Sequence, residues 1–240
     1  MNPHNFSIIT VTLNSQKTLK TCLQSVQQQR DVSVQHIVKD GQSNDRTREI
    51  ALSFKNVSFY AEKDIGIYDA MNQGFMRSTG DIIGFLNSDD YYSDENFLSK
   101  VWNVFSEEAA DIVCAGITYI DPDTTKIKPW RVGKKLAKRG IKQYPHPGVF
   151  IKKRVLEKLN TPFDKNFKIS SDYKQQLILF SNSSFKVVLL DEISIHMRYG
   201  GVSNRTINAK LLGIWECVKA QIEVNGFIFA PLAIFKIWLK

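Results

Sequence analysis

Short runs of apolar and β-branched residues alternate with amphipathic segments over the first 90 residues, and this alternation restricts the fold more than any other feature. The runs 6–13, 34–38, 57–61 and 81–86 have the length and composition of buried parallel strands. The segments 17–29 and 67–78 carry apolar residues at helical spacing. Strand–helix alternation of this kind predicts an α/β fold in which helices cover a mainly parallel sheet.

The second half of the chain is less regular. We expect a strand at 111–120, a helix at about 172–180, a strand at 185–190 and a helix at about 206–224. A chain of 240 residues, 43% of them hydrophobic, can bury one sizeable core without disulfides. Its three cysteines are widely spaced and form no CxxC or Cys/His cluster, so we expect reduced thiols and no zinc site.

Polar side chains collect where the predicted strands end, and ligands of open α/β sheets bind beyond those ends. The residues are Asn14, Asp40, Glu62, Asp64, Asp89 and Asp90. Some carboxylates at such positions only cap helices, but capping is a poor account of the whole set, because gathered carboxylates repel one another. We therefore expect a ligand site at this edge.

Three of these segments carry recognisable chemistry. In 40–47, Asp40 is placed to accept from a nucleobase N–H such as that of uracil, and a well-capped turn is the alternative interpretation. In 64–74 the informative residues are Asp64, Gly66 and Asn72. In 87–90, adjacent carboxylates form a hard-oxygen site suited to Mg²⁺ or Mn²⁺. The chain contains neither an EF-hand loop nor a GxxxxGK[ST] phosphate-binding loop.

A fourth segment, Ser170-Ser171-Asp172, opens the helix expected at 172–180. A serine or the aspartate of this segment could simply be an N-cap. As a functional residue, Asp172 would be a general base that removes a proton from an acceptor hydroxyl.

Taken together, these segments resemble the family 2 glycosyltransferases of the GT-A fold. The opening SIITVTLN, the DGQSNDRT turn, EKDIGIYDAMNQG and STGDIIGFLNSDD stand in the family's order over about residues 6–92. Asp172 matches the position of the family's catalytic aspartate. Residues 146–150 and 198–203 resemble weaker, later motifs. The likeness is greatest to enzymes that build bacterial exopolysaccharide, capsule or O-antigen repeats, including those of colanic-acid type.

The resemblance implies a GT-A (Rossmann-like) mixed, mainly parallel sheet with a C-terminal helical and aromatic appendage. It also implies an inverting transfer of hexosyl or N-acetylhexosaminyl type from a nucleotide-diphosphate sugar, with a UDP-sugar as the expected donor. Asp172 would be the catalytic base and Asp89 and Asp90 would hold Mn²⁺ or Mg²⁺. The donor would be bound by Thr12, Asn14, Asp40, Asp64, Asn72, Asn87 and Asp89. Asn87 replaces the first aspartate of the family's metal motif, and Ser171 replaces the glutamate that often precedes the base.

Two histidines extend this expected site. Some GT-A enzymes use a late histidine as an additional metal ligand, and His196 is the candidate here, with a structural or acceptor-contacting role as the alternative. His146 could contact the acceptor, and an ordinary role in a loop is the alternative interpretation.

The net charge of +8 has a local origin. Residues 126–142 carry eight basic side chains and no acidic one, and removing those eight leaves 24 basic against 24 acidic residues. With the aromatic tail at 226–240, this segment suggests contact with a membrane surface, which fits an acceptor linked to a polyprenyl diphosphate. Alternatively the segment is a solvated loop and the tail packs on the protein or on a second subunit, as in a homo-oligomer.

We predict a catalytic domain over 1–205, with a nucleotide-binding half at about 1–92 and an acceptor half at about 93–205. Residues 206–240 would form a C-terminal helix and a membrane-proximal or packing tail. The N-terminus does not resemble a signal peptide, and the longest apolar stretch is shorter than the roughly 20 residues that span a bilayer. We therefore expect a cytoplasmic protein, peripheral at the inner face of the membrane.

Three other functions are weighed against this one. A nucleotidyltransferase would need a glycine-rich, basic loop after the first strand, which residues 14–18 lack. A nucleic-acid binder would carry basic and aromatic residues interleaved across the fold, so we expect no nucleic-acid partner. An inactive sugar-nucleotide sensor would be favoured by loss of one of the four aspartates Asp40, Asp89, Asp90 and Asp172, all of which are present.

Overall fold

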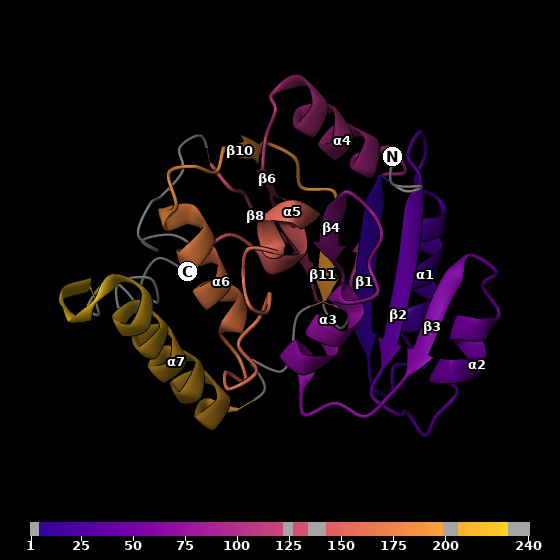
Figure 1. The fold of residues 1–240 in the computed structure, drawn as a ribbon. Helices are drawn as coiled ribbons and strands as arrows, with labels where there is room; N and C mark the ends of the chain where they lie inside the picture. Colours follow the sequence, from indigo (N-terminus) through magenta and orange to yellow (C-terminus); the bar gives the residue numbers. More distant parts are fainter. Residues whose placement is uncertain (1–4, 122–126, 134–142, 199–205, 230–240) are drawn as a thin grey trace.

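The structure is a computed structural model that describes residues 5–121, 127–133, 143–198 and 206–229. Its centre is a seven-stranded sheet in the order β10-β6-β9-β4-β1-β2-β3 (Figure 1). The seven strands are β1 (Phe6–Thr12), β2 (Val34–Asp40), β3 (Val57–Ala61), β4 (Ile82–Phe85), β6 (Ile112–Ala115), β9 (Val149–Lys152) and β10 (Val187–Leu190). The strand β9 is antiparallel to β4 and β6, and the other pairs are parallel, so the predicted mixed, mainly parallel sheet is confirmed.

Helices cover both faces of this sheet, because the side chains of a buried strand alternate between two apolar layers. Ile8 lies in a cluster with α1 and α4, whereas Ile9 lies in a cluster on the other face with α3 and α6. The α-helices are α1 (Leu19–Gln27), α2 (Thr47–Leu52), α3 (Ile67–Phe75), α4 (Phe97–Glu107), α5 (Lys153–Leu156), α6 (Ser171–Ser181) and α7 (Ile207–Asn225). The described residues also include two short 3-10 helices, η2 (His146–Gly148) and η4 (Phe227–Phe229).

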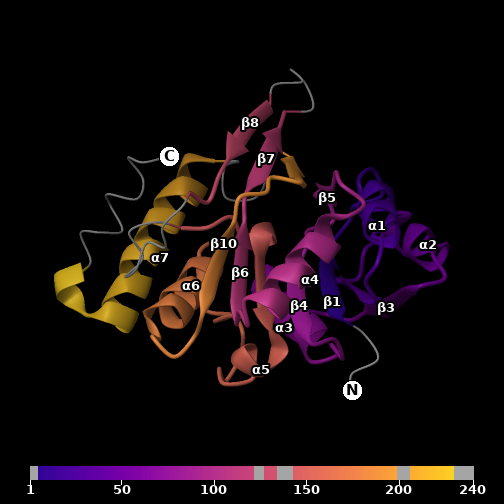
Figure 2. The ribbon, with the colours of Figure 1, turned by 90° about the horizontal axis from the view of Figure 1, so that it is seen from above.

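A four-stranded sheet lies beside the large one, in the order β5-β11-β7-β8. Its strands are β5 (Tyr91–Tyr92), β11 (Ile195–Arg198), β7 (Ile117–Ile120) and β8 (Ile127–Trp130). Figure 2 shows β7 and β8 extending beyond the body of the molecule.

The prediction of one strand over 111–120 is wrong, because the chain changes sheets at Gly116. Residues 112–115 form β6 of the large sheet, and residues 117–120 form β7 of the small one. The backbone packs closely here: a Cβ on Gly116 would lie 2.7 Å from the carbonyl oxygen of Trp130. The amide N–H of Gly116 also donates to Glu192 O at 2.7 Å, which fixes the crossing point.

The C-terminal helix predicted at about 206–224 is present as α7 and lies beside α6 (Figure 1). The three cysteines are buried and free, as expected. Within the described ranges, none of the helices has both the length and the hydropathy that crossing a membrane requires.

Candidate active site

The ends of β1 and β2 meet at the carboxyl edge of the large sheet. Thr12 pairs with Asp40 in the parallel register, and the N–H of Gly41 donates to Thr12 O at 2.9 Å. The Thr12 hydroxyl oxygen is buried and has no hydrogen-bond partner among the described residues. The structure therefore brings these two predicted site residues together and leaves an unused polar atom at the edge.

The turn after β2 is ordered by side chains from two loops. Asp40 is 1% exposed, and its Oδ2 accepts from the N–H of Ser43 at 2.8 Å. Asn14 adopts a positive φ of 53°, its N–H donates to Ser43 Oγ at 2.8 Å, and its Oδ1 accepts from the N–H of Asn44 at 3.0 Å. These contacts fit the capped-turn interpretation, and nucleobase recognition by Asp40 stays a prediction.

A buried lysine that the sequence analysis missed lies directly below this turn. The Lys39 side chain is fully buried, and its Nζ donates to Asp40 O at 2.9 Å, Glu62 O at 2.7 Å and Asp64 Oδ2 at 3.0 Å. The other Asp64 oxygen accepts from the N–H of Gly66 at 3.2 Å. Lys39 thus ties the ends of β2 and β3 together and holds Asp64 in place. In the sequence, a lysine within an otherwise apolar strand could have marked this residue as one with a buried partner.

The segment after β4 carries the predicted metal residues. Asn87 Oδ1 and Asp90 Oδ1 are buried and lack hydrogen-bond partners among the described residues, while Asn87 Nδ2 donates to Asp90 Oδ2 at 3.3 Å. Burial raises the pKa of Asp90 well above its usual range, and the neighbouring charge of Asp89 raises it further. Two carboxylates and an amide oxygen of this kind fit a hard divalent cation, which would supply the missing positive charge.

His196 belongs to β11, opposite Tyr91, and its Nδ1 lies 3.0 Å from the Tyr91 hydroxyl. Burial lowers its pKa, which favours the neutral ring that ligates metals. Arg198, two residues further along β11, donates through Nε to Asp89 O at 3.1 Å. However, no group of three His, Cys, Asp or Glu ligands is gathered among the described residues. Asp89, Asp90 and His196 therefore do not form a complete metal cage, and a cation here would need oxygens from a bound diphosphate or from water.

The carboxylate of Asp172 is held at both oxygens. Gln143 Nε2 donates to Oδ2 at 2.9 Å, and the Tyr68 hydroxyl lies 3.1 Å from Oδ1 and 2.6 Å from Ile169 O. Asp172 occupies the first turn of α6, while Tyr68 belongs to α3. Burial is the main cause that raises the pKa of Tyr68, and the charge of Asp172 adds to it, so this phenol stays a hydrogen-bond donor.

His146 links Asp172 to the strand ends through ring contacts. Its ring stacks on Phe85 at a centroid distance of 5.4 Å and meets Phe163 edge-on at 5.5 Å, and Phe163 stacks on Tyr68. His146 Nε2 is buried without a hydrogen-bond partner among the described residues. Burial lowers the pKa of His146, and the Asp172 charge partly opposes that shift. Because Phe85 precedes Asn87 by two residues, these ring contacts connect the surroundings of Asp172 with the strand that leads to the predicted metal segment.

Asn72 hydrogen-bonds the backbone of the loop that carries Phe163. Its Nδ2 donates to Phe163 O at 2.8 Å, and its Oδ1 accepts from the N–H of Phe163 at 3.0 Å. Both polar groups of the side chain are therefore engaged with the backbone. Asn72 thus fixes the loop that carries Phe163, and its assignment to donor binding stays a prediction.

A second residue missed from the sequence is Glu216 on α7, which is 2% exposed. Its carboxylate accepts from the N–H groups of residues 168, 169 and 170, immediately before α6. These partners are 46 to 48 residues away along the chain, so no local pattern marks Glu216. Gln143 and Tyr68 were missed for the same reason.

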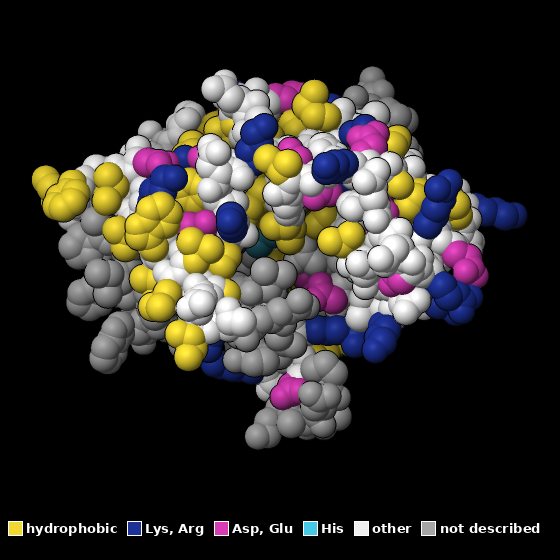
Figure 3. Space-filling model, turned by 90° about the horizontal axis from the view of Figure 1, so that it is seen from below, with side chains coloured by type: hydrophobic (Ala, Val, Ile, Leu, Met, Phe, Trp, Pro, Cys, Tyr) yellow, Lys and Arg dark blue, Asp and Glu magenta, His cyan; other side chains and the backbone are white. Residues whose placement is uncertain are grey.

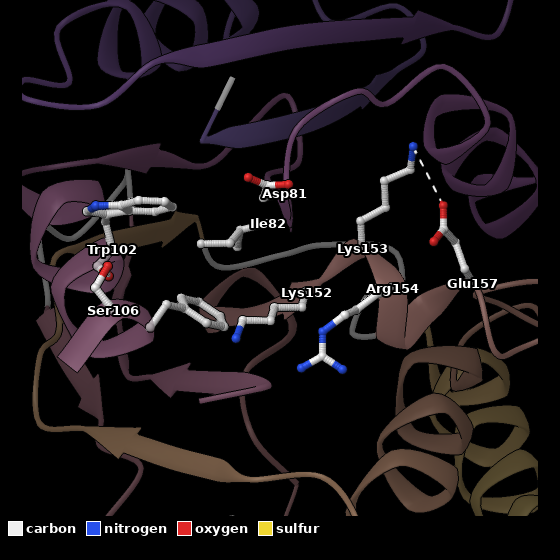
Figure 4. A pocket seen from close by; sticks show the side chains of 9 residues that line it. Asp81, Ile82, Trp102, Ser106, Lys152, Lys153, Arg154 and Glu157 are labelled. Atoms are coloured by element: carbon white, nitrogen blue, oxygen red, sulfur yellow. Dashed lines mark hydrogen bonds and ion pairs between the residues drawn. The ribbon is translucent and has the colours of Figure 1, made fainter. Parts of the chain in front are cut away.

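A pocket of about 540 Å³ opens at the other end of β4, between α4 and the end of β9 (Figure 4). Lys152, Lys153, Arg154 and Glu157 line it, with Trp102 and Phe105 on the side of α4. Lys153 and Arg154 are paired with Glu157 and Asp111. None of the site residues predicted from the sequence is among the described residues that line this pocket, so it is separate from the candidate site.

A model of the family described as "Glycosyl transferase family 2" matches residues 7–167. A "PGL/p-HBAD biosynthesis glycosyltransferase" of Mycobacterium tuberculosis is 26% identical over 214 residues, which cover 86% of this chain and 82% of the relative. An uncharacterized glycosyltransferase of the same organism is 30% identical over 181 residues, covering 72% of this chain and 67% of the relative.

Two solved structures share the fold. Staphylococcus aureus TarS 1–349 in complex with UDP-GlcNAc has a TM-score of 0.69 at 15% identity, and the alignment covers 97% of this chain and 71% of that one. The mannosyltransferase PcManGT of Pyrobaculum calidifontis, in complex with GDP-Man and Mn²⁺, has a TM-score of 0.64 at 13% identity, covering 98% and 74%. At these identities the likeness establishes the GT-A fold.

Proposed function

The chain belongs to glycosyl transferase family 2, and from that membership we propose that it transfers a hexosyl or N-acetylhexosaminyl group from a UDP-sugar to a saccharide hydroxyl with inversion. One observation carries the proposal: Asp172 is a carboxylate held by two donors, and His146 connects its surroundings with β4, the strand that leads to Asp89 and Asp90. The name of the mycobacterial relative and the UDP-GlcNAc bound to TarS support a donor of this class and a role in bacterial surface polysaccharide synthesis.

In this proposal the donor binds at the carboxyl edge of β1, β2 and β4. Asp40 and the unused Thr12 hydroxyl face the nucleotide, with Asn14 supporting their turn. Asp64, oriented by Lys39, contacts the ribose or the sugar. Asn87 and Asp89 reach the diphosphate side of the donor from the end of β4.

Asp89 and Asp90 would hold Mn²⁺ or Mg²⁺, and the orphaned oxygens of Asn87 and Asp90 fit such an ion. When bound, the ion neutralises charge on the departing diphosphate. His196 is close to this segment through Tyr91 and is a candidate further ligand.

Asp172 is the base in the proposed transfer. It takes the proton of the acceptor hydroxyl, the acceptor oxygen attacks the anomeric carbon, and the bond from that carbon to the diphosphate oxygen breaks. Gln143 and Tyr68 fix the direction of the carboxylate, and His146 lines the acceptor side. Attack opposite the leaving group inverts the anomeric configuration without a covalent intermediate.

Binding of nucleotides tests the proposal first. The purified chain is titrated calorimetrically with UDP, GDP, TDP and CMP, each with and without Mn²⁺, and with Asp90→Ala. We expect Mn²⁺-dependent binding of UDP that is lost in Asp90→Ala and kept in Asp81→Ala, a carboxylate at the other end of the same strand. Failure of every nucleotide to bind would refute the donor assignment and favour an inactive protein.

We also propose that the protein docks on the membrane that carries its acceptor. The arrows of β1 and β2 in Figure 1 point to the edge that Figure 3 views, and hydrophobic side chains gather there over α7. The exposed residues are Ile207, Leu211, Trp215, Ile222, Phe227 and Ile228. They repeat at helical spacing along one face of α7 and continue into η4. Most of 126–142 and most of 226–240, the segments predicted to make this contact, lie outside the described residues.

A further inference from the structure

Glu216 lies on α7 and accepts hydrogen bonds from the backbone immediately before α6. Its buried carboxylate accepts from the N–H groups of Lys168 at 2.7 Å, Ile169 at 2.9 Å and Ser170 at 2.8 Å. The first N–H groups of a helix and its N-cap have no partners within the helix. Ser170, the N-cap of α6, makes no capping bond with its own side chain, and Glu216 instead accepts from the N–H of this N-cap and of the two residues before it.

The same helix holds this segment at further points. Ser170 Oγ donates to Gly213 O at 3.1 Å, and Cys217 Sγ lies 3.5 Å from Ser170 Oγ. Gln221 Nε2 donates to the Tyr173 hydroxyl at 2.7 Å. Figure 1 shows α7 alongside α6, so both helices meet along the segment that leads to Asp172.

Ile169 connects the hydrogen bonds at Glu216 to the carboxylate of Asp172. Its N–H donates to Glu216, and its carbonyl oxygen lies 2.6 Å from the Tyr68 hydroxyl. The same hydroxyl lies 3.1 Å from Asp172 Oδ1. A shift of the Ile169 peptide would therefore move the Tyr68 hydroxyl and the Asp172 carboxylate relative to each other.

A role in stability alone does not account for the choice of side chain. A serine or threonine N-cap stabilises a helix without burying a charge, whereas a buried carboxylate must be fully hydrogen-bonded to be tolerated. Glu216 instead fixes three successive peptides from outside the helix. Such rigid support keeps a catalytic group within about 0.5 Å of its productive position.

We propose that Glu216 is a positioning residue for the base: by holding residues 168–170 it sets the direction of the Asp172 carboxylate, so that α7 is part of the catalytic machinery. The inference rests on the proposed transferase function. It extends the functional unit past residue 205, where the predicted catalytic domain ends.

The Glu216→Gln variant tests this in the full-length chain. Glutamine has the same shape, but its NH₂ group would face backbone N–H groups instead of accepting from them. We expect kcat with the UDP-sugar that the wild type uses to fall at least tenfold, while the KM for that donor and the affinity for UDP stay within about twofold. Hydrogen exchange at residues 168–170 should become faster.

Glu223→Gln is the matched control on the same helix. Glu223 is paired with Lys174 of α6 at 2.5 Å and contacts none of residues 168–170 in the described hydrogen bonds, so its kcat should match the wild type. A kcat for Glu216→Gln within about twofold of the control, or equal losses of kcat and UDP affinity, would overturn the proposal. If the wild type turns over no nucleotide sugar, the proposed function fails, and unchanged exchange at 168–170 would then overturn the positioning role by itself.

Gly213→Ala keeps the proposal testable if Glu216→Gln does not fold. A Cβ at this position would lie 3.3 Å from Ile169 Cγ2, which is a tight contact. Alanine is also a better helix former than glycine. We expect unchanged or higher thermal stability together with a kcat reduced several-fold. Wild-type turnover in this variant would contradict the proposal.

Discussion

Replacing Asp172 by asparagine separates chemistry from folding at this site. The side chain keeps its shape, and its oxygen still accepts from the Tyr68 hydroxyl at 3.1 Å. The new NH₂ group would face the Gln143 Nε2 donor, which lies 2.9 Å from Oδ2 in the wild type. Rotation of the Gln143 amide by half a turn presents its oxygen instead and restores the hydrogen bond.

The size of the two effects follows from these contacts. Exchanging hydrogen bonds to a charged group for neutral ones costs about 1 kcal/mol of stability, which lowers Tm by about 2–4 °C in a chain of this size. The chemical loss is far larger, because general-base catalysis contributes about 10²–10⁴-fold to a rate. Turnover should therefore fall by about 10²–10⁴-fold in a folded protein.

The assay measures release of UDP from the donor, together with UDP affinity by calorimetry and Tm by thermal unfolding. UDP affinity should stay within about twofold, because the strand-end residues are unchanged. Asp164→Asn is the control: this carboxylate is paired with Lys174 outside the site, and turnover should persist. An Asp172→Asn protein that keeps more than about a tenth of the wild-type rate would show that another group is the base.

Two further predictions concern the core and the surface. Burial lowers the pKa of His36 to about 3, so this ring stabilises the fold fully above pH 6.5, and the contribution is lost as the pH falls towards about 3. The titration of His36 alone should make the free energy of unfolding in urea about 2 kcal/mol lower at pH 5 than at pH 7. An equal pH dependence in the His36→Gln variant would contradict this assignment. In co-sedimentation, vesicles containing anionic lipid should retain the wild type, and Leu211→Ser combined with Trp215→Ser should weaken retention. A wild type that stays in the supernatant, or a stable dimer that buries α7, would refute docking on a membrane.

The nucleotide side of the site was accessible from the sequence, because strand patterns and the carboxyl-edge rule are local. Buried strands at 6–13 and 34–38 are sufficient to place Thr12 near Asp40, since adjacent parallel strands end at one edge. The strand pattern does not predict what the Asn72 amide binds. Its amide could equally serve a ligand or a backbone, and only the fold shows Phe163 opposite it.

The surroundings of the base could not be predicted in this way. Glu216, Gln143 and Tyr68 reach Asp172 or its supporting loop from separate elements. Their proximity depends on tertiary packing that leaves no periodic trace in the sequence. The division of 111–120 between two sheets was missed for a related reason, because apolar alternation is the same in one long strand and in two short ones.

The reversed direction of β9 has a consequence for how this protein could be altered. Every other strand of the large sheet delivers the residues that follow it to the active-site edge, whereas β9 delivers those that precede it, among them Gln143 and His146. A shift of β9 along β4, where Ile82 pairs with Lys152, would therefore displace Gln143 and His146 together, while β1, β2 and β3 keep their register. Under the proposed function, such a shift would act on the acceptor side of the site and leave the strands that bind the donor in place.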